Sequence, residues 1–150
     1  MNKCGCLCLL VFFALPLWAK AHTDITIQQA YAMMQNDPNI IVLDVREESE
    51  YCGKLGHVSG SDNYPYISGV FQKRYTDFAP NKSIILVCHS GNRSNKAAKF
   101  LDSKGFLKVY DVRGGMKAWH KDYPTVGCDD DDDDDEDEDG SNDDLTWFAG

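Results

Sequence analysis

The feature that most limits the possible folds is a continuous apolar run at residues 84–87 (IILV) that ends in Cys88. A second run of this kind lies at residues 40–43 (IIVL). Strands that are apolar throughout, rather than at alternate positions, are typical of sheets covered on both faces. A short polar loop and a helical segment follow the first run, an order that is typical of an α/β domain with a parallel sheet.

The rest of the chain continues this alternation. Helices are predicted at 28–36, 47–51, 70–78, 94–104 and 116–121, extended segments at 25–27, 40–43, 83–88 and 108–112, and between 53 and 66 a loop with one short edge strand. Parallel strands then need right-handed crossovers. Ligands of such sheets bind beyond the carboxyl ends of the strands. Both the loop after Cys88 and the segment from Asp44 to Arg46 are expected there.

The loop after Cys88 has the residue types of a reactive thiol site. Ser94 is predicted to be the N-cap of the helix that follows. Backbone N–H groups of a tight loop and of a helix N-terminus favour negative charge, so a thiol facing them loses its proton more easily. Arg93 adds donors suited to an oxyanion. The alternative is that Cys88 packs as a small apolar residue.

The first 21 residues have the pattern of an export signal. Lys3 precedes an apolar run at residues 7–17, and the sequence Ala-Lys-Ala at 19–21 fits a cleavage site that would leave His22 first. A single-span anchor is the rival interpretation, but the run is shorter than the ~20 residues that a membrane helix needs. We therefore expect an exported protein, periplasmic or secreted, without a stable membrane span.

The C-terminal region carries most of the negative charge. Residues 129–139 are all acidic, and 13 of the 24 acidic residues lie in 129–150. The rest of the chain therefore has 11 acidic residues and 15 Lys and Arg. The chain therefore divides into a signal at 1–21, a mildly basic domain at 22–128 and an acidic, disordered tail at 129–150. The tail either binds divalent cations weakly or is simply solvated, and we favour the second. No basic stripe indicates nucleic acid.

The cysteines leave two arrangements open. Cys4, Cys6 and Cys8 would be lost with the signal, which leaves Cys52, Cys88 and Cys128. Either Cys52 pairs with Cys128 in an oxidising compartment and Cys88 stays free, or all three are free thiols. No set of metal ligands is predicted.

Four segments, taken in order, resemble the signatures of a known family, the single-domain rhodaneses (thiosulfate sulfurtransferase-like proteins). The segments are residues 41–46 (IVLDVR) with Glu50 and Tyr51, residues 56–58 (GHV) with Gly60, Asn63, Pro65 and Tyr66, residues 88–93 (CHSGNR), and residues 112–119 (VRGGMKAW). The resemblance implies an α/β rhodanese-like domain with a five-stranded, mainly parallel sheet flanked by helices. It also implies that Cys88 carries a persulfide.

The resemblance assigns roles to the loop. Cys88 and Arg93 would be catalytic, and Asp44 with Arg46 would support the site as an ion pair. The substrate-binding residues would be His89, Ser90, Gly91, Asn92 and Ser94. Gly91 is expected to be needed for the shape of the backbone.

The function that follows is a sulfurtransferase. Cys88 would take a sulfur atom from a donor such as thiosulfate and pass it to cyanide or a thiol, without a cofactor. A protein sulfur acceptor is a further option. One alternative is a non-catalytic sulfur-binding or redox-sensing module. Another is a phosphatase or arsenate reductase of the same fold, but those relatives have five residues between cysteine and arginine, and the four found here favour sulfur.

Overall fold

The computed structural model describes residues 22–128. The predicted export signal at 1–21 and the predicted acidic tail at 129–150 lie outside these residues. The described part contains one sheet with strands β1 (Thr23–Ile25), β2 (Ile41–Asp44), β3 (Asp62–Asn63), β4 (Ser83–Val87) and β5 (Lys108–Val112). The helices are α1 (Ile27–Asn36), α2 (Glu48–Tyr51), α3 (Val70–Arg74), a 3₁₀ turn η1 (Tyr75–Asp77), α4 (Asn92–Ser103) and α5 (Gly115–Asp122).

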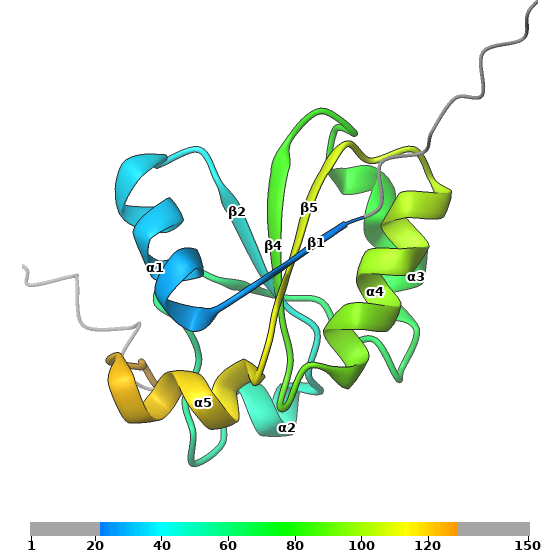
Figure 1. The fold of residues 1–150 in the computed structure, drawn as a ribbon. Helices are drawn as coiled ribbons and strands as arrows, with labels where there is room; N and C mark the ends of the chain where they lie inside the picture. The colour runs from blue at the N-terminus through cyan, green and yellow to red at the C-terminus, as the bar shows by residue number, and fades with distance from the viewer. Residues whose placement is uncertain (1–21, 129–150) are drawn as a thin grey trace, which may run out of the picture.

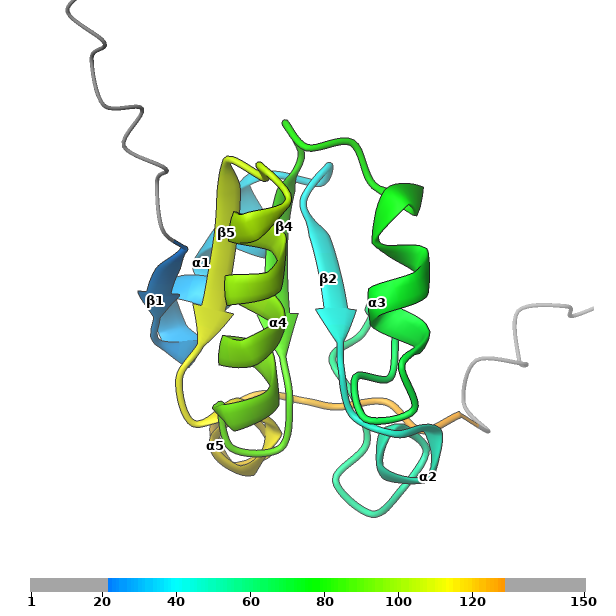
Figure 2. The same ribbon diagram turned by 90° about the vertical axis from the view of Figure 1, so that its right-hand side faces the viewer.

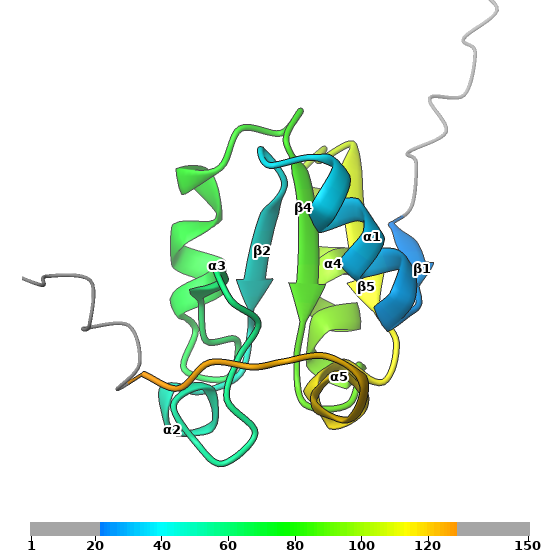
Figure 3. The same cartoon turned by 90° about the vertical axis from the view of Figure 1, so that its left-hand side faces the viewer.

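The five strands are all parallel, in the order β1-β5-β4-β2-β3. The predicted α/β fold with a five-stranded parallel sheet is therefore confirmed. The arrows of β2 and β4 point to the end of the sheet where α2 and α5 lie (Figure 3). The loop after Cys88 leaves β4 at that end.

Helices cover both faces of the sheet. Helices α3 and α4 lie on one face and α1 on the other (Figures 1 and 2). Along β4, Ile84 and Leu86 pack into the core on the α3 and α4 side, whereas Ile85 and Val87 pack into the core on the α1 and α5 side. This two-sided burial explains why the strand is a continuous apolar run.

Most element boundaries differ from the predictions by a residue or two, and three of the differences bear on the argument. The first strand is Thr23–Ile25 rather than 25–27, because Thr26 caps α1 and exchanges capping hydrogen bonds with Gln29. The helix predicted at 70–78 ends as an α-helix at Arg74 and continues as η1. The third difference, the start of α4, changes the site and is described below.

A disulfide joins Cys52 to Cys128, and Cys88 is the free cysteine of residues 22–128. Of the two arrangements left open by the sequence, the one with three free thiols is wrong. Residues 123–128 cross from α5 to α2 beneath the carboxyl ends of β4 and β2 (Figure 3). An antiparallel bridge between His57 and Val126 fixes the same segment. We call residues 123–128 the C-terminal strap.

Between residues 22 and 128, every helix is too short or too polar to cross a bilayer.

Candidate active site

The sulfur of Cys88 faces the loop that follows it. The backbone N–H of Gly91 donates to Sγ at 3.1 Å, and the hydroxyl of Ser94 donates to it at 3.4 Å. The residue is 1% exposed, and its other side packs in the core with Leu86 and Ala97. Cys88 is thus buried as the apolar interpretation expected, but its sulfur accepts hydrogen bonds from the predicted loop.

The prediction that Ser94 caps the helix is wrong. Helix α4 begins at Asn92, and Gly91 is its N-cap, with a φ of 104° in the region that favours glycine. Ser94 therefore lies in the first turn of α4, fully buried, and its hydroxyl bonds to Cys88 Sγ and to the carbonyl of Gly91. The N–H of the N-cap Gly91 and the hydroxyl of Ser94 thus bring the N-terminus of α4 to the sulfur, and the end of a helix that carries unpaired N–H groups favours negative charge.

A second helix N-terminus fixes the loop from the other side. The N–H of Met116 donates to the carbonyl of Cys88 at 2.8 Å, and that of Lys117 donates to the carbonyl of His89 at 2.9 Å. The start of α5 approaches so closely that a Cβ on Gly115 would lie 2.2 Å from the Cys88 carbonyl oxygen. Gly115 therefore allows α5 to contact the loop backbone directly.

Arg93 is paired with a residue to which the sequence analysis gave no role. Its Nη2 lies 2.7 Å from Glu50 Oε1, and its Nη1 bonds the other carboxylate oxygen. The hydrogen bonds from Arg93 hold the pKa of Glu50 below its usual range, and Glu50 raises the pKa of Arg93. A thiolate at Cys88 would act on the pKa of Arg93 in the same direction, so the guanidinium lies within electrostatic reach of the sulfur.

A buried ion pair between Asp44 and Arg46 positions α2. Arg46 bonds both oxygens of Asp44, at 2.6 to 3.0 Å, and each side chain is 1% exposed. Arg46 also donates to the carbonyls of Glu50 and Gly56. Because it holds the backbone of Glu50, this ion pair determines where the partner of Arg93 lies. Its predicted supporting role thus has a structural basis.

The remaining loop side chains lie on the surface and line two separate cavities. His89 lines a cavity of about 200 Å³ together with Arg46 and Glu50. Ser90, Gly91 and Asn92 line another of about 330 Å³, whose other walls are Asp24, Asn95, Asp111, Arg113 and Gly114. The predicted substrate-binding residues are therefore divided between the two flanks of the loop, and Ser94 lies beneath them.

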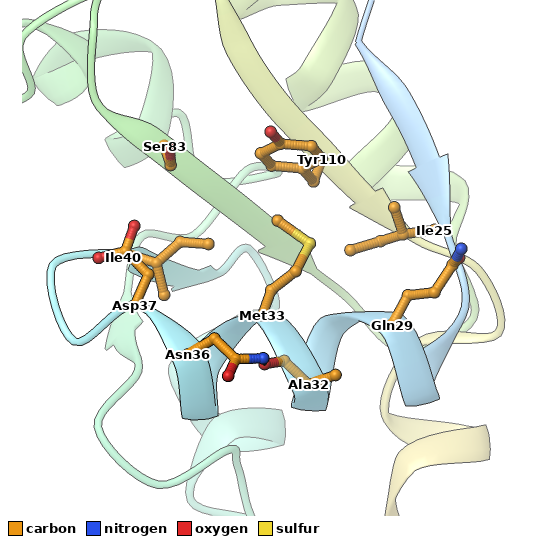
Figure 4. Close-up of a pocket in the computed structure, with 9 residues that line it drawn as sticks. All are labelled: Ile25, Gln29, Ala32, Met33, Asn36, Asp37, Ile40, Ser83 and Tyr110. Carbon is orange, nitrogen blue, oxygen red and sulfur yellow. The ribbon is translucent and has the colours of Figure 1, made fainter.

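A larger cavity, of about 510 Å³, lies elsewhere, between α1 and the sheet (Figure 4). Its walls include Met33 on α1, Ile25 on β1 and Tyr110 on β5. It contains neither Cys88 nor Arg93, so the chemistry of the loop places the site at the opposite, carboxyl end of the strands.

The sequence signal for the Arg93 partner was present but incomplete. Glu50 belongs to the segment after the Asp44–Arg46 strand end, where residues approach the loop of a neighbouring parallel strand. Three acidic residues, Glu47, Glu48 and Glu50, occur there together, and only the folded position of α2 distinguishes among them.

Comparison with known proteins gives one consistent result. The family described as "Rhodanese-like domain" matches residues 26–122. The chain is 34% identical over 107 residues to a thiosulfate sulfurtransferase GlpE of Tolumonas auensis, covering 68% of this chain and 92% of that protein. It is 34% identical over 101 residues to a "putative sulfur carrier protein YrkF" of Bacillus subtilis, covering 67% of this chain but 52% of that protein.

The fold comparison agrees. The crystal structure of a rhodanese-related protein from Thermoplasma volcanium superposes with a TM-score of 0.60 at 32% identity, covering 70% of this chain and 98% of that one. Because the family match spans most of the described residues and includes the loop from Cys88 to Arg93, the chain belongs to the rhodanese-like domain family.

Proposed function

We propose that this domain is a sulfurtransferase that carries a sulfane sulfur as a persulfide on Cys88. The observation that carries the proposal is the setting of the Cys88 sulfur, which accepts bonds from Gly91 N–H and Ser94 hydroxyl at the N-terminus of α4. A buried sulfur with oriented donors favours a charged nucleophile and its persulfide. The reaction needs no resident cofactor.

The chemistry has two steps. The Cys88 thiolate attacks the outer sulfur of thiosulfate, a new S–S bond forms, and sulfite leaves with the electron pair of the old one. A nucleophilic acceptor such as cyanide or a thiol then attacks the outer sulfur of the persulfide, and the Cys88 thiolate is the leaving group. The N–H groups that begin α4 stabilise the sulfur-centred charge in both steps.

Glu50 adds a feature to the first step. Its carboxylate occupies both terminal nitrogens of Arg93, which are the donors suited to the oxygens of thiosulfate. An anionic donor therefore competes with Glu50 for Arg93. We infer that donor binding opens this ion pair and that Arg93 then contacts the leaving sulfite.

Mass spectrometry of the intact protein after thiosulfate treatment tests the proposal. We expect a gain of one sulfur atom that peptide mapping places on Cys88, that cyanide removes as thiocyanate, and that Cys88→Ser abolishes. Mapping matters because Cys4, Cys6 and Cys8 are further thiols of the full chain. A gain located on those residues, or retained in Cys88→Ser, would contradict the proposal.

A sulfur carrier without turnover is the second candidate. Two observations favour it: Cys88 is 1% exposed, and one relative is named as a sulfur carrier. Steady-state kinetics separate the two. Repeated formation of thiocyanate from thiosulfate and cyanide, with ping-pong kinetics, supports the enzyme, whereas a single stoichiometric transfer supports the carrier.

We also propose that the protein is exported and works in an oxidising compartment. The disulfide between Cys52 and Cys128 supports this, because such bonds persist outside the reducing cytosol. Amino-terminal sequencing of the protein from its native cell should find His22 first. Recovery of the uncleaved chain from the cytosol, with both cysteines reduced, would contradict this proposal.

A further inference from the structure

His22, Asp24 and Asp111 form a cluster at the edge of the sheet where β1 pairs with β5. One ligand atom of each residue lies within 4.8 Å of the others. Asp24 and Asp111 also line the cavity of about 330 Å³ beside the loop. The cluster contains neither Cys88 nor the Glu50–Arg93 pair, so the sulfur-transfer mechanism does not explain it.

The imidazole of His22 is oriented as a ligand. Its Nδ1 lies 2.6 Å from Asp102 Oδ2, and the backbone N–H of His22 donates to the same oxygen at 3.1 Å. Asn95 Nδ2 lies 3.1 Å from Nε2, and an amide N–H there needs an acceptor, so Nε2 carries the lone pair. A carboxylate behind Nδ1, with the lone pair of Nε2 directed away from it, is the arrangement found in metal-binding histidines, although Asn95 occupies that lone pair when no cation is bound.

Asp111 provides a buried oxygen without a partner. The residue is 3% exposed, and its Oδ2 accepts a hydrogen bond from Asn95 at 3.2 Å. Its Oδ1 has no partner within hydrogen-bond distance among residues 22–128, although the hydroxyl of Ser94 also lies near this carboxylate. A bound cation would supply the missing partner.

Asp24 provides the third ligand atom, a carboxylate oxygen. Arg113 Nη2 lies 2.6 Å from Asp24 Oδ2 and lowers the pKa of that carboxyl. The other oxygen, Oδ1, lies 3.7 Å from His22 Nε2. Arg113 therefore fixes Asp24 through one oxygen, while the second oxygen faces the imidazole.

We propose that His22, Asp24 and Asp111 bind a divalent first-row transition cation of the Zn²⁺ type. One nitrogen and two carboxylate oxygens suit such ions, whereas Ca²⁺ and Mg²⁺ prefer oxygen ligands alone. Tetrahedral coordination at about 2.1 Å places ligand atoms about 3.4 Å apart, so the widest separation needs to close by about 1.4 Å. Water completes the coordination, and Asn95 turns its amide away from Nε2.

Cobalt is the probe that separates this site from the other metal-binding groups of the chain. Co²⁺ held by nitrogen and oxygen in a four-coordinate site absorbs strongly in the visible region. Co²⁺ on the acidic residues of 129–150 would be six-coordinate and nearly colourless, and Co²⁺ on Cys88 or on the thiols of Cys4, Cys6 and Cys8 would show a sulfur charge-transfer band in the near ultraviolet. We expect the full-length protein to bind one Co²⁺ with the first spectrum and to lose it to Zn²⁺.

Variants then assign the ligands. His22→Ala and Asp111→Asn should each weaken Co²⁺ binding at least about tenfold, and Asp102→Asn, which alters a positioning residue, should weaken it about tenfold. Matched controls on α5, His120→Ala and Asp122→Asn, and the thiol control Cys88→Ser should leave the spectrum unchanged. Asp111→Asn is expected to fold because it removes a buried charge, and circular dichroism checks this.

The proposal fails if the full-length protein shows only the weak six-coordinate spectrum, or if His22→Ala retains the strong one. It also fails if Cys88→Ser abolishes the strong spectrum. Sulfur transfer is measured separately, so loss of activity in Cys88→Ser with intact Co²⁺ binding distinguishes this site from the proposed function.

Discussion

At the scale of single residues, the ion pair of Arg93 with Glu50 is the feature that the proposed mechanism requires a donor to open. Glu50→Gln removes one negative charge and weakens the hold on Arg93. Removal of a unit charge a few ångströms from the bound anion changes its binding by about 1 kcal/mol, so KM for thiosulfate should fall about fivefold. Steady-state kinetics check this. Glu48→Gln, an exposed neighbour on α2, is the control and should leave KM unchanged.

The same residue makes a pH-dependent contribution to stability. The bonds from Arg93 lower the pKa of Glu50 in the folded protein, so its contribution is fully present above the unfolded value of about 4.3. It is lost as the pH falls through the lower folded value. Urea unfolding across the acid range should show a shallower loss of stability in Glu50→Gln than in the parent. An equal loss in both would show that the pair adds nothing.

Gly115 has to lack a Cβ because it lies directly against the backbone of the loop after Cys88. In Gly115→Ala the new Cβ would lie 2.2 Å from the carbonyl oxygen of Cys88, and φ at this position is +53°. We expect a loss of several kcal/mol in the free energy of unfolding and no persulfide formation in the protein that still folds.

Gly60→Ala is the matched control for that substitution. It shares a positive φ but has no atom within 4 Å of the new Cβ, so it should cost only about 1 kcal/mol. Equal losses in the two variants would mean that backbone strain alone, and not contact with the loop, explains the effect.

At the scale of elements, the sequence predicted what depends on local patterns. The strand at 83–87 and the helix after it follow from apolar runs, and the fold class follows from their order. The predicted cap of α4 was wrong because Ser94 and Gly91 both suit a helix start, and in the fold it is Gly91, with its φ of 104°, that precedes the first helical residue. The pairing of Arg93 with Glu50 joins two elements 43 residues apart, which no local pattern records.

The disulfide also joins two parts of the chain that are far apart in the sequence. It links Cys52, at the end of α2, to Cys128, at the end of the C-terminal strap, across 76 residues. By closing a loop of that length, the disulfide lowers the entropy of the unfolded chain and stabilises the fold by about 4 kcal/mol in the chain-entropy model. The double substitution Cys52→Ser/Cys128→Ser should lower the free energy of unfolding by about that amount, measured in urea.

Dithiothreitol provides the control for the disulfide. It should destabilise the parent and the Cys88→Ser variant equally, since Cys88 is free, and should leave the double variant unchanged. Destabilisation of the double variant by the reductant would show that another disulfide contributes.

At the scale of the whole molecule, charge is segregated along the chain. Residues 22–128 hold 13 Lys and Arg against 11 Asp and Glu, whereas residues 129–150 hold 13 acids and no base. The proposed donor thiosulfate is an anion, so the negative charge of residues 129–150 should oppose its approach by electrostatic repulsion. That repulsion is screened beyond about 8 Å at physiological ionic strength.

Truncation after Cys128 therefore has a salt-dependent outcome. At physiological ionic strength kcat/KM for thiosulfate should change by less than about twofold, and at low salt the truncated chain should be the faster one because the repulsion is gone. A salt series with both chains measures this. Loss of activity in the truncated chain at every salt concentration would mean that residues 129–150 contribute more than charge. Because the truncated chain keeps Cys128, its disulfide to Cys52 still holds the C-terminal strap, so such a loss could not come from detachment of residues 123–128.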